Sequence, residues 1–354
     1  MSEIELFNKT KEKIEKMFEC LDSVKETHPY VVVMLLHDLA RNIYPSDPFI
    51  PFEKDIHRLD YINKTVPEYI DTINCFKKWG GYKVDFTAIS NNRKENLEVK
   101  VKTGKVYGKL WNKYSGNMVD EAVDIIKERF ESNGFNLENL KDKIILDAGC
   151  GSGRYSCALA KLGAKKVFGL DYGVDGLKKA NELANINNIT NIEFTQGSVL
   201  DMPFDDETFD FIFHNGVFHH TESLNKATEE LFRVLKNNGI SWYYIYGAGG
   251  IFWYLRRKMN DFMKNNIPQD YAVKILEDIG MPMNRFIFAD NWYVPIEEHT
   301  TKIEIENMFH SVGFSEYERA CNGRNTDPDY ISENGTEKDK LMWGDGELRY
   351  FIKK

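Results

Sequence analysis

The sequence has few cysteines, no long apolar run and no excess of positive charge. Its five cysteines are scattered and form no C-x-x-C pair, so they predict reduced thiols in a cytoplasmic protein, without a disulfide framework or zinc site. The first residues lack the apolar core of a signal peptide, and no later run is long enough to span a membrane. No cluster of side chains has metal-ligand spacing. We therefore expect a cytoplasmic protein that needs neither a metal nor a membrane.

The charge balance is acidic. Lys and Arg total 46 against 55 Asp and Glu, which gives a formal net charge of −9 and a pI of about 5.5. Such a chain lacks the general attraction to phosphate that supports nucleic-acid binding, so a small-molecule partner is favoured and nucleic acid is not expected. With 42% apolar and 13% aromatic residues, the 354 residues can bury a sizeable core in two domains, or in one domain with an extension.

The organising motif of the chain is the segment 143–171. The apolar run Ile144–Leu146 predicts a strand buried on both faces, and a glycine-rich turn, a helix over 155–162 and a second short strand follow. Asp171 ends the second strand. Glycines let the backbone approach a ligand, the helix N-terminus offers unpaired N–H groups, and the acid can accept ribose hydroxyls. The motif therefore predicts a nucleotide-binding βαβ unit.

The glycine spacing separates two classes of nucleotide. A dinucleotide fingerprint, G-x-G-x-x-G, would need glycine where Arg154 stands. The turn instead reads D-A-G-C-G-S-G, with Asp147 ahead of the glycines. A pyrophosphate has no use for that acid, whereas a ligand with an ammonium group does. The segment closely resembles motif I, D-x-G-C-G-x-G, of class I S-adenosylmethionine (SAM)-dependent methyltransferases.

The resemblance continues in the family's order from Lys143 to about Tyr246. It includes D-M-P-F at 201–204 and R-V-L-K-N-N-G at 233–239, where the family usually has R-V-L-K-P-G-G. It implies SAM as cofactor and S-adenosylhomocysteine as product. The implied cofactor-binding residues are Asp147, Gly149, Cys150, Gly151, Gly153, Asp171, Tyr172, Ser198, Val199, Asn215 and Gly216. Ser198 departs from the pattern, because the family often has Asp there to accept from the adenine amino group.

Aromatic residues ahead of the core suggest a lid. In many small-molecule methyltransferases an aromatic-rich segment just before the core folds over the cofactor. Tyr107 and Trp111 are the candidates for that role by position, and packing in a domain seam is the alternative for both.

The order of predicted elements indicates an α/β fold. We expect a Rossmann-like, doubly wound, seven-stranded sheet with the last strand antiparallel, an N-terminal helical extension and a cap inserted after the fifth strand. The expected domains are a helical extension at 1–80, a β-hairpin with a lid or linker helix at 81–140, and the SAM-binding methyltransferase domain at 141–354, with the cap at 247–300. The extension could serve packing, homo-oligomer contacts or substrate selection, and these roles remain open.

Two local features of this organisation are expected as well. A helix of the extension should begin near Val66, after a proline-rich stretch. The segment 322–340, close to the end of the chain, is rich in Asn, Asp, Glu and Gly and is expected to be a polar loop.

Three histidines are candidate catalytic bases: His219, His220 and His299. The pair His219-His220 follows the predicted fourth strand, and ligands of doubly wound sheets bind at the carboxyl ends of strands. Adjacent residues in a helical turn point about 100° apart, so the two rings cannot face one site in the same way. Hydrogen bonding within the fold is the alternative for each. Imidazole titrates near neutral pH, but methyl transfer needs a base only when the acceptor is a poor nucleophile. His220 and His299 are the preferred candidates.

Three functions are compatible with these features. The first is methyl transfer from SAM to a small molecule such as a metabolite, a sugar or a natural-product intermediate, which the acidic charge and the aromatic cap favour. The second is methylation of tRNA or protein, which would require a basic face at 256–264. The third is a non-catalytic SAM-binding scaffold whose N-terminal helices bind a partner. The intact glycine turn and Asp171 argue against this third function.

Overall fold

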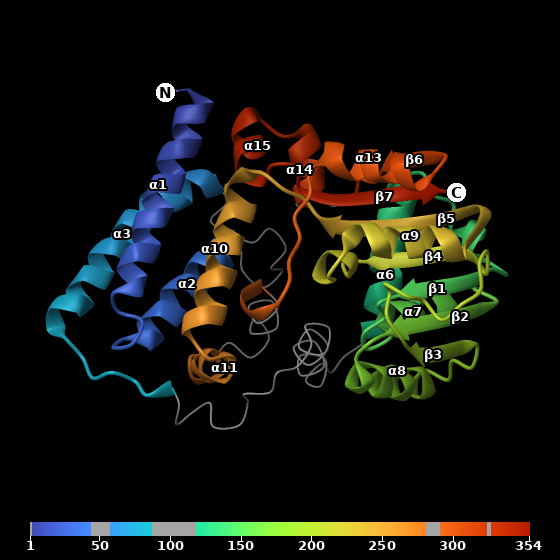
Figure 1. Cartoon of the computed structure of the whole chain (residues 1–354), viewed down its shortest axis with the longest axis horizontal. Coiled ribbons are helices and arrows are strands. Elements are labelled where there is room, and N and C mark those ends of the chain that lie inside the picture. Colours follow the sequence, from blue (N-terminus) through green and yellow to red (C-terminus); the bar gives the residue numbers. More distant parts are fainter. Residues whose placement is uncertain (1, 44–56, 87–117, 281–290, 324–326) are drawn as a thin grey trace. The chain divides into compact units, whose positions relative to one another are not determined.

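The computed structural model describes residues 2–43, 57–86, 118–280, 291–323 and 327–354 (Figure 1). Contacts divide the chain into two compact units. One, called the helical unit here, comprises 1–96, 249–294 and 334–344. The other, called the sheet unit, comprises 97–248, 295–333 and 345–354.

The sheet unit is built on one seven-stranded sheet in the order β3-β2-β1-β4-β5-β7-β6. The strands are β1 (Ile144–Ala148), β2 (Lys166–Asp171), β3 (Ile192–Gln196), β4 (Phe209–Asn215), β5 (Leu235–Tyr246), β6 (Glu316–Arg319) and β7 (Glu347–Lys353). Neighbours among the first five strands pair in parallel, and β7 is antiparallel to both β5 and β6. The predicted doubly wound α/β sheet with an antiparallel last strand is confirmed.

Helices cover both faces of this sheet. On one side lie α6 (Met118–Ser132), α7 (Arg154–Lys161) and α8 (Val174–Ile186), and on the other lie α9 (Leu224–Val234) and α13 (Lys302–Val312). Side chains of β5 alternate between the two cores, so that Trp242 packs with α6 and Tyr243 with α9. The chain winds from β1 toward β3 and then from β4 toward β7. The boundary between β1 and β4 is therefore the topological switch point, where such sheets bind ligands.

The helical unit combines three distant parts of the chain. Its helices are α1 (Glu3–Asp22), α2 (Pro29–Ile43), α3 (Arg58–Trp79), α10 (Gly250–Asn266), α11 (Gln269–Asp278) and α15 (Glu337–Trp343). Helix α1 packs on α3 and α10, and α2 packs on α11. Phe18 meets Phe262 with ring centroids 5.6 Å apart, and Glu15 pairs with Lys258 at 2.7 Å. The expected N-terminal extension and most of the expected cap insertion thus share one core, as far as their residues are described. The role of 247–300 as a cap stays a prediction.

Helix α3 begins earlier than expected. The prediction placed its start near Val66, whereas the structure begins it at Arg58 and keeps Pro67 inside it. Proline has no N–H for the carbonyl of Asn63, four residues earlier. Lys13 of α1 donates to that carbonyl at 3.1 Å instead, which supplies the hydrogen bond that the proline removes. A contact from another helix therefore overrides the local signal.

The expectation of a polar loop at 322–340 is wrong for its described residues. Most of them form α14 (Pro328–Asn334) and the first turn of α15. Thr336 and Asp339 form a capping box that starts α15. Asp329 is buried against Arg349. Capping and a buried ion pair order a segment whose composition is typical of a loop.

The expected β-hairpin lies almost entirely outside the described residues. Of its first strand only 82–86 are described, and none of these residues is in a strand. Tyr107 and Trp111, the lid candidates, also lie outside the described residues. Within the described ranges, no helix combines the length and apolar character needed to cross a membrane. In the same ranges no three His, Cys, Asp or Glu side chains gather as a metal site would require.

Candidate cofactor and active site

The glycine turn after β1 is shaped so that only glycine fits. Gly149, Gly151 and Gly153 have φ of 86°, 54° and 77°, in the left-handed region that side chains disfavour. A Cβ on Gly149 would lie 2.5 Å from the side chain of Val217, and one on Gly153 would lie 2.7 Å from that of Ala180. The turn therefore runs close to α8 and to the segment that follows β4, and it leads directly into the N-terminus of α7.

Asp171, at the end of β2, holds this turn. Its Oδ2 accepts a hydrogen bond from the Gly151 N–H at 2.8 Å, and its Oδ1 accepts one from the Gly173 N–H at 2.7 Å. Burial raises the pKa of this carboxyl. Each carboxylate oxygen has a second lone pair, so the geometry leaves capacity for ribose hydroxyls. The predicted ribose acid is thus also a clamp on the backbone of the turn.

Asp147 lies buried at the opening of the turn. Ser156 of α7 donates to its Oδ2 at 2.6 Å, and burial raises the pKa of the carboxyl to about 7. Cys150, between the first two glycines, is also buried, and burial raises the pKa of its thiol well above the usual range. Cys150 therefore contributes backbone and packing to the turn, while Asp147 supplies an acid that can change charge near neutral pH.

The predicted adenine residues follow β3. The Ser198 hydroxyl accepts from the Leu200 N–H at 3.1 Å, so it is engaged in its own turn. Val199 is buried in the core beneath β1 and β4. Tyr172 follows Asp171, and its carbonyl accepts from Gln196 at 3.3 Å. These contacts place Ser198 and Val199 beside the end of β3 and give the Ser198 side chain a structural task.

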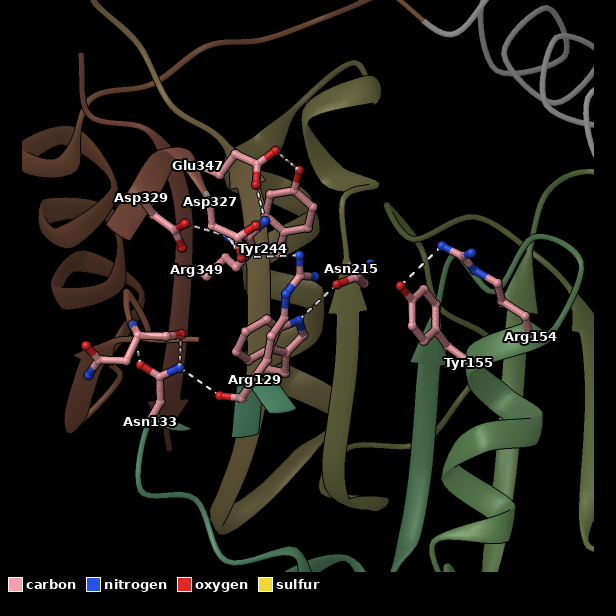
Figure 2. Close-up of polar contacts among 12 residues, drawn as sticks. Arg129, Asn133, Arg154, Tyr155, Asn215, Tyr244, Asp327, Asp329, Glu347 and Arg349 are labelled. Carbon is pink, nitrogen blue, oxygen red and sulfur yellow. Dashed lines mark hydrogen bonds and ion pairs between the residues drawn. The ribbon is translucent and has the colours of Figure 1, made fainter. Parts of the chain in front are cut away.

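The predicted methionine residues follow β4. Asn215 Oδ1 accepts from the indole N–H of Trp242 at 3.0 Å, a contact drawn in Figure 2. Gly216 has φ of 81° and donates its N–H to the carbonyl of Tyr244 at 3.0 Å. Because Gly149 meets Val217, these residues adjoin the glycine turn across the switch point.

The three candidate bases gather around Tyr246, the last residue of β5. Its ring centroid lies 3.8 Å from that of His219, 5.5 Å from that of His220 and 6.1 Å from that of His299. The two adjacent histidines occupy the short helix η2 (Phe218–His220) and are both buried. Sequence reasoning missed Tyr246, although its place at the carboxyl end of a parallel strand was a usable signal.

A short segment, 295–300, is bound to these histidines by its backbone. The Glu298 N–H donates to the His219 carbonyl at 2.8 Å, and His220 Nδ1 lies 2.9 Å from the carbonyl of Ile296. A carbonyl only accepts, so Nδ1 of His220 carries the proton. The neutral ring then has its lone pair on Nε2, which is the arrangement of an oriented general base.

His299 differs from His220 in its partners. Its Nδ1 lies 2.8 Å from the carbonyl of Gly247, and its Nε2 lies 2.6 Å from Oε1 of Glu297. Both ring nitrogens of His299 are therefore engaged by oxygen atoms of the fold. The choice between His220 and His299 as a proton acceptor stays a prediction, and we expect His220.

His214, near the end of β4, was not singled out from the sequence. Its Nε2 accepts from the N–H of Phe218 at 2.9 Å, and its ring stacks on that of Phe218 at 3.6 Å. Burial holds the pKa of His214 well below its usual value, so the ring stays neutral. It fixes the turn that carries His219 and His220.

The family comparison agrees with this geometry. Residues 139–244 match the family model described as "Methyltransferase domain". They form a methyltransferase domain. The match and the strand order together confirm the class I methyltransferase fold that the glycine motif predicts. The methyltransferase domain includes β1 to β4, most of β5, and the predicted cofactor-binding residues within the described part of the chain.

Curated relatives match part of the chain. An uncharacterized methyltransferase of Bacillus subtilis, YcgJ, is 32% identical over 95 residues, which cover 27% of this chain and 37% of the relative. The sterol 24-C-methyltransferase erg6 of Schizosaccharomyces pombe is 27% identical over 137 residues, 38% of this chain and 33% of that protein. A demethylmenaquinone methyltransferase of Staphylococcus carnosus is 34% identical over 98 residues, 27% of this chain and 40% of the relative. The chain thus spans between 33% and 40% of the length of these relatives.

Solved structures show weaker likeness. A SAM-dependent methyltransferase structure from Methanococcus maripaludis has 20% identity and a TM-score of 0.42, over 74% of this chain and 97% of that one. The crystal structure of YcgJ from Bacillus subtilis has 16% identity and a TM-score of 0.40, over 66% of this chain and 95% of that one. Scores this low add nothing about function.

Proposed function

We propose that the protein is an enzyme that transfers the methyl group of SAM to a small-molecule acceptor. The observation that carries the proposal is the glycine turn at the switch point, with three glycines at positive φ held by Asp171 within a methyltransferase domain. Added Cβ atoms at Gly149 and Gly153 would collide with their neighbours, so the backbone is shaped for close approach.

The described residues fit SAM. Asp171 would accept the ribose hydroxyls, and Asp147 would face the ammonium group across the turn. Asn215 and Gly216 would line the methionine half. When bound, SAM supplies an electrophilic methyl group on a positively charged sulfur. The chain's own contribution is to position an acceptor in line with the carbon–sulfur bond and to exclude water. His220 Nε2 would take the proton of an acceptor that is a poor nucleophile.

A small acceptor is supported by the surroundings of the candidate bases. His219, His220 and Tyr246 are buried, and His299 is nearly so, which suits a ligand that can be enclosed. Two relatives are named as sterol and demethylmenaquinone methyltransferases, whose named substrates are small molecules. The described cysteines are free thiols, which fits a reducing cytoplasm.

The alternative of a tRNA or protein substrate required a basic face at 256–264. In the structure Arg256 is buried, Lys258 pairs with Glu15 at 2.7 Å and Lys264 pairs with Asp261 at 2.9 Å. Of the four cations in this segment, Arg257 and Lys264 are exposed, and the charge of Lys264 is balanced by Asp261. Their placement supports a structural role for the segment and so favours the small-molecule proposal.

The test begins with binding and continues with transfer. Isothermal titration with SAM should show one site per chain. Incubation with methyl-labelled SAM and separated small-molecule and macromolecular cell fractions should then place label in the small-molecule fraction. Label on RNA or protein would overturn the substrate class. SAM binding without any transfer would favour the scaffold, and absence of binding would overturn the whole proposal.

A further inference from the structure

A buried ion network lies at the edge of the sheet beyond β5 (Figure 2). Its centre is Arg349 of β7, whose side chain is 4% exposed. The guanidinium donates to Asp329 at 2.6 Å and to Asp327 at 3.3 Å, and it also pairs with Glu347. Arg129 of α6 reaches Asp327 at 3.5 Å. The network brings together three carboxylates and two guanidiniums, and therefore carries an excess of one negative charge when all are ionised.

Glu347 connects this network to β5. The Tyr244 hydroxyl donates to its Oε1 at 2.9 Å, and Arg349 donates to its Oε2. The Arg349 guanidinium also lies over the Tyr244 ring, 4.9 Å from its centroid. Burial raises the pKa of Glu347, while the positive charge of Arg349 favours its ionised form.

The network adjoins the proposed cofactor site. In the antiparallel pair of β5 and β7, Tyr246 lies opposite Glu347 and Tyr244 opposite Arg349, so Glu347 stands at the carboxyl end of β5. Gly216 donates its N–H to the Tyr244 carbonyl, and a Cβ at Gly216 would lie 3.1 Å from the Tyr244 ring. The chain of contacts from the glycine turn through Gly216 to Glu347 is continuous.

The direction in which SAM would lie follows from the strand order. Asp171, the proposed ribose acid, ends β2, and β1, β4 and β5 follow in that order across the sheet. The half of SAM that carries the sulfonium would therefore extend toward β4 and β5, and toward the network beyond them. An unbalanced negative charge acts strongly on a nearby cation in a poorly solvated site.

We infer that Glu347 is a specificity-determining residue of the same site, whose charge favours the sulfonium of SAM over the neutral sulfur of S-adenosylhomocysteine. This inference rests on the proposed function. Methyl transfer moves the methyl to the acceptor and leaves the electron pair of the broken carbon–sulfur bond on sulfur, so the cofactor loses its positive charge. The network keeps its negative charge, and the product is held less tightly than the substrate.

The test measures two dissociation constants, for SAM and for S-adenosylhomocysteine, by calorimetry at one pH. Glu347→Gln keeps the shape of the side chain and removes its charge. We expect it to weaken SAM several-fold and to leave the product's affinity almost unchanged. Tyr244→Phe removes the hydroxyl that donates to Glu347 but keeps the charge of Glu347. The ratio of the two dissociation constants should therefore stay near that of the native protein.

Two further variants keep the result interpretable. Asp329→Asn removes a negative charge from the other side of Arg349. Like Glu347→Gln, it should reduce the preference for SAM over S-adenosylhomocysteine, so it tests the inference even if Glu347→Gln does not fold. Glu333→Gln removes a charge that pairs with Lys302 at 3.0 Å and with Arg319, none of which contacts the network, and it should leave the ratio unchanged.

The inference would be overturned if Glu347→Gln and Asp329→Asn lost affinity equally for both ligands, or for neither. The proposed function would still stand. Binding of neither ligand by the native protein would overturn both.

Discussion

Ser156 donates a hydrogen bond of 2.6 Å to the carboxyl group of Asp147, and this pair is buried between β1 and the first turn of α7. The hydrogen bond favours the ionised acid, but burial outweighs it and raises the pKa of Asp147 to about 7. The acid at the opening of the glycine turn therefore titrates close to neutral pH.

The first prediction concerns stability against pH. The folded protein holds the Asp147 proton more tightly than the unfolded chain, where the acid titrates near its ordinary value of 3.8. The contribution of this group to stability is therefore present at low pH and is lost as pH rises toward about 7. Urea unfolding of the apoprotein at pH 5 and pH 8 measures the free energy of unfolding. Raising the pH should lower this free energy less in Asp147→Asn than in the native protein. Equal losses would refute the assignment.

The same titration affects ligand binding in the opposite direction. An ammonium group binds the ionised acid better, so SAM affinity should fall as pH drops below about 7. Asp147→Asn should bind SAM weakly at every pH, with a flatter profile. Calorimetric titrations between pH 5.5 and 8.5 check this, and a mutant profile as steep as the native one would count against it.

The second prediction concerns Asp171. Asp171→Ala removes two hydrogen bonds to the turn, at 2.8 and 2.7 Å, together with the proposed ribose contact. SAM binding should be lost, because hydrogen bonds to charged groups are worth about 1.5–3 kcal/mol each. Asp175→Ala is the matched control, since it removes an exposed acid four residues further along the chain. Retained SAM affinity in Asp171→Ala would break the assignment of the pocket.

The fold was largely predictable because its signals are local. The buried strand β1, the alternating glycines and the acid ending β2 each indicate their structure directly. The last strand of the chain, β7, is antiparallel as expected. Helix α14 and the early start of α3 were not predictable, because Arg349 and Lys13, which support them, come from distant parts of the chain.

The candidate site was predictable only in outline. The histidines could be named from their place after a strand, but their tautomers depend on the carbonyls of Ile296 and Gly247, which no local pattern reveals. Glu347 was hidden for the same reason. It lies two residues before Arg349 in the sequence, and its contact with Tyr244 arises only when β7 pairs with β5.

The third prediction separates backbone strain from collision at the glycine turn. Gly153 and Gly134 both have positive φ, at 77° and 75°. A Cβ at Gly134 would meet nothing within 4 Å, whereas one at Gly153 would lie 2.7 Å from the Ala180 Cβ. Gly134→Ala should therefore cost about 1–2 kcal/mol from the left-handed backbone alone. Gly153→Ala should cost clearly more and also weaken SAM. Urea unfolding and SAM titration of both variants measure the difference, and equal effects would show that the turn is not closely packed.

The fourth prediction tests the choice between the histidines. His220→Asn keeps an N–H that can donate to the Ile296 carbonyl and removes the Nε2 lone pair. For an acceptor that must lose a proton, the rate of label transfer at saturating SAM should fall by about 10²–10⁴-fold, with SAM affinity unchanged. His299→Asn keeps a donor to the Gly247 carbonyl and loses the contact with Glu297. Because both nitrogens of His299 are engaged by oxygen atoms of the fold, we expect a smaller loss of rate. The rates are measured from pH 6 to 9 on the cell fraction that the native protein labels. A larger loss of rate in His299→Asn than in His220→Asn would reverse the assignment. An unchanged rate in both variants would show that positioning alone carries the reaction.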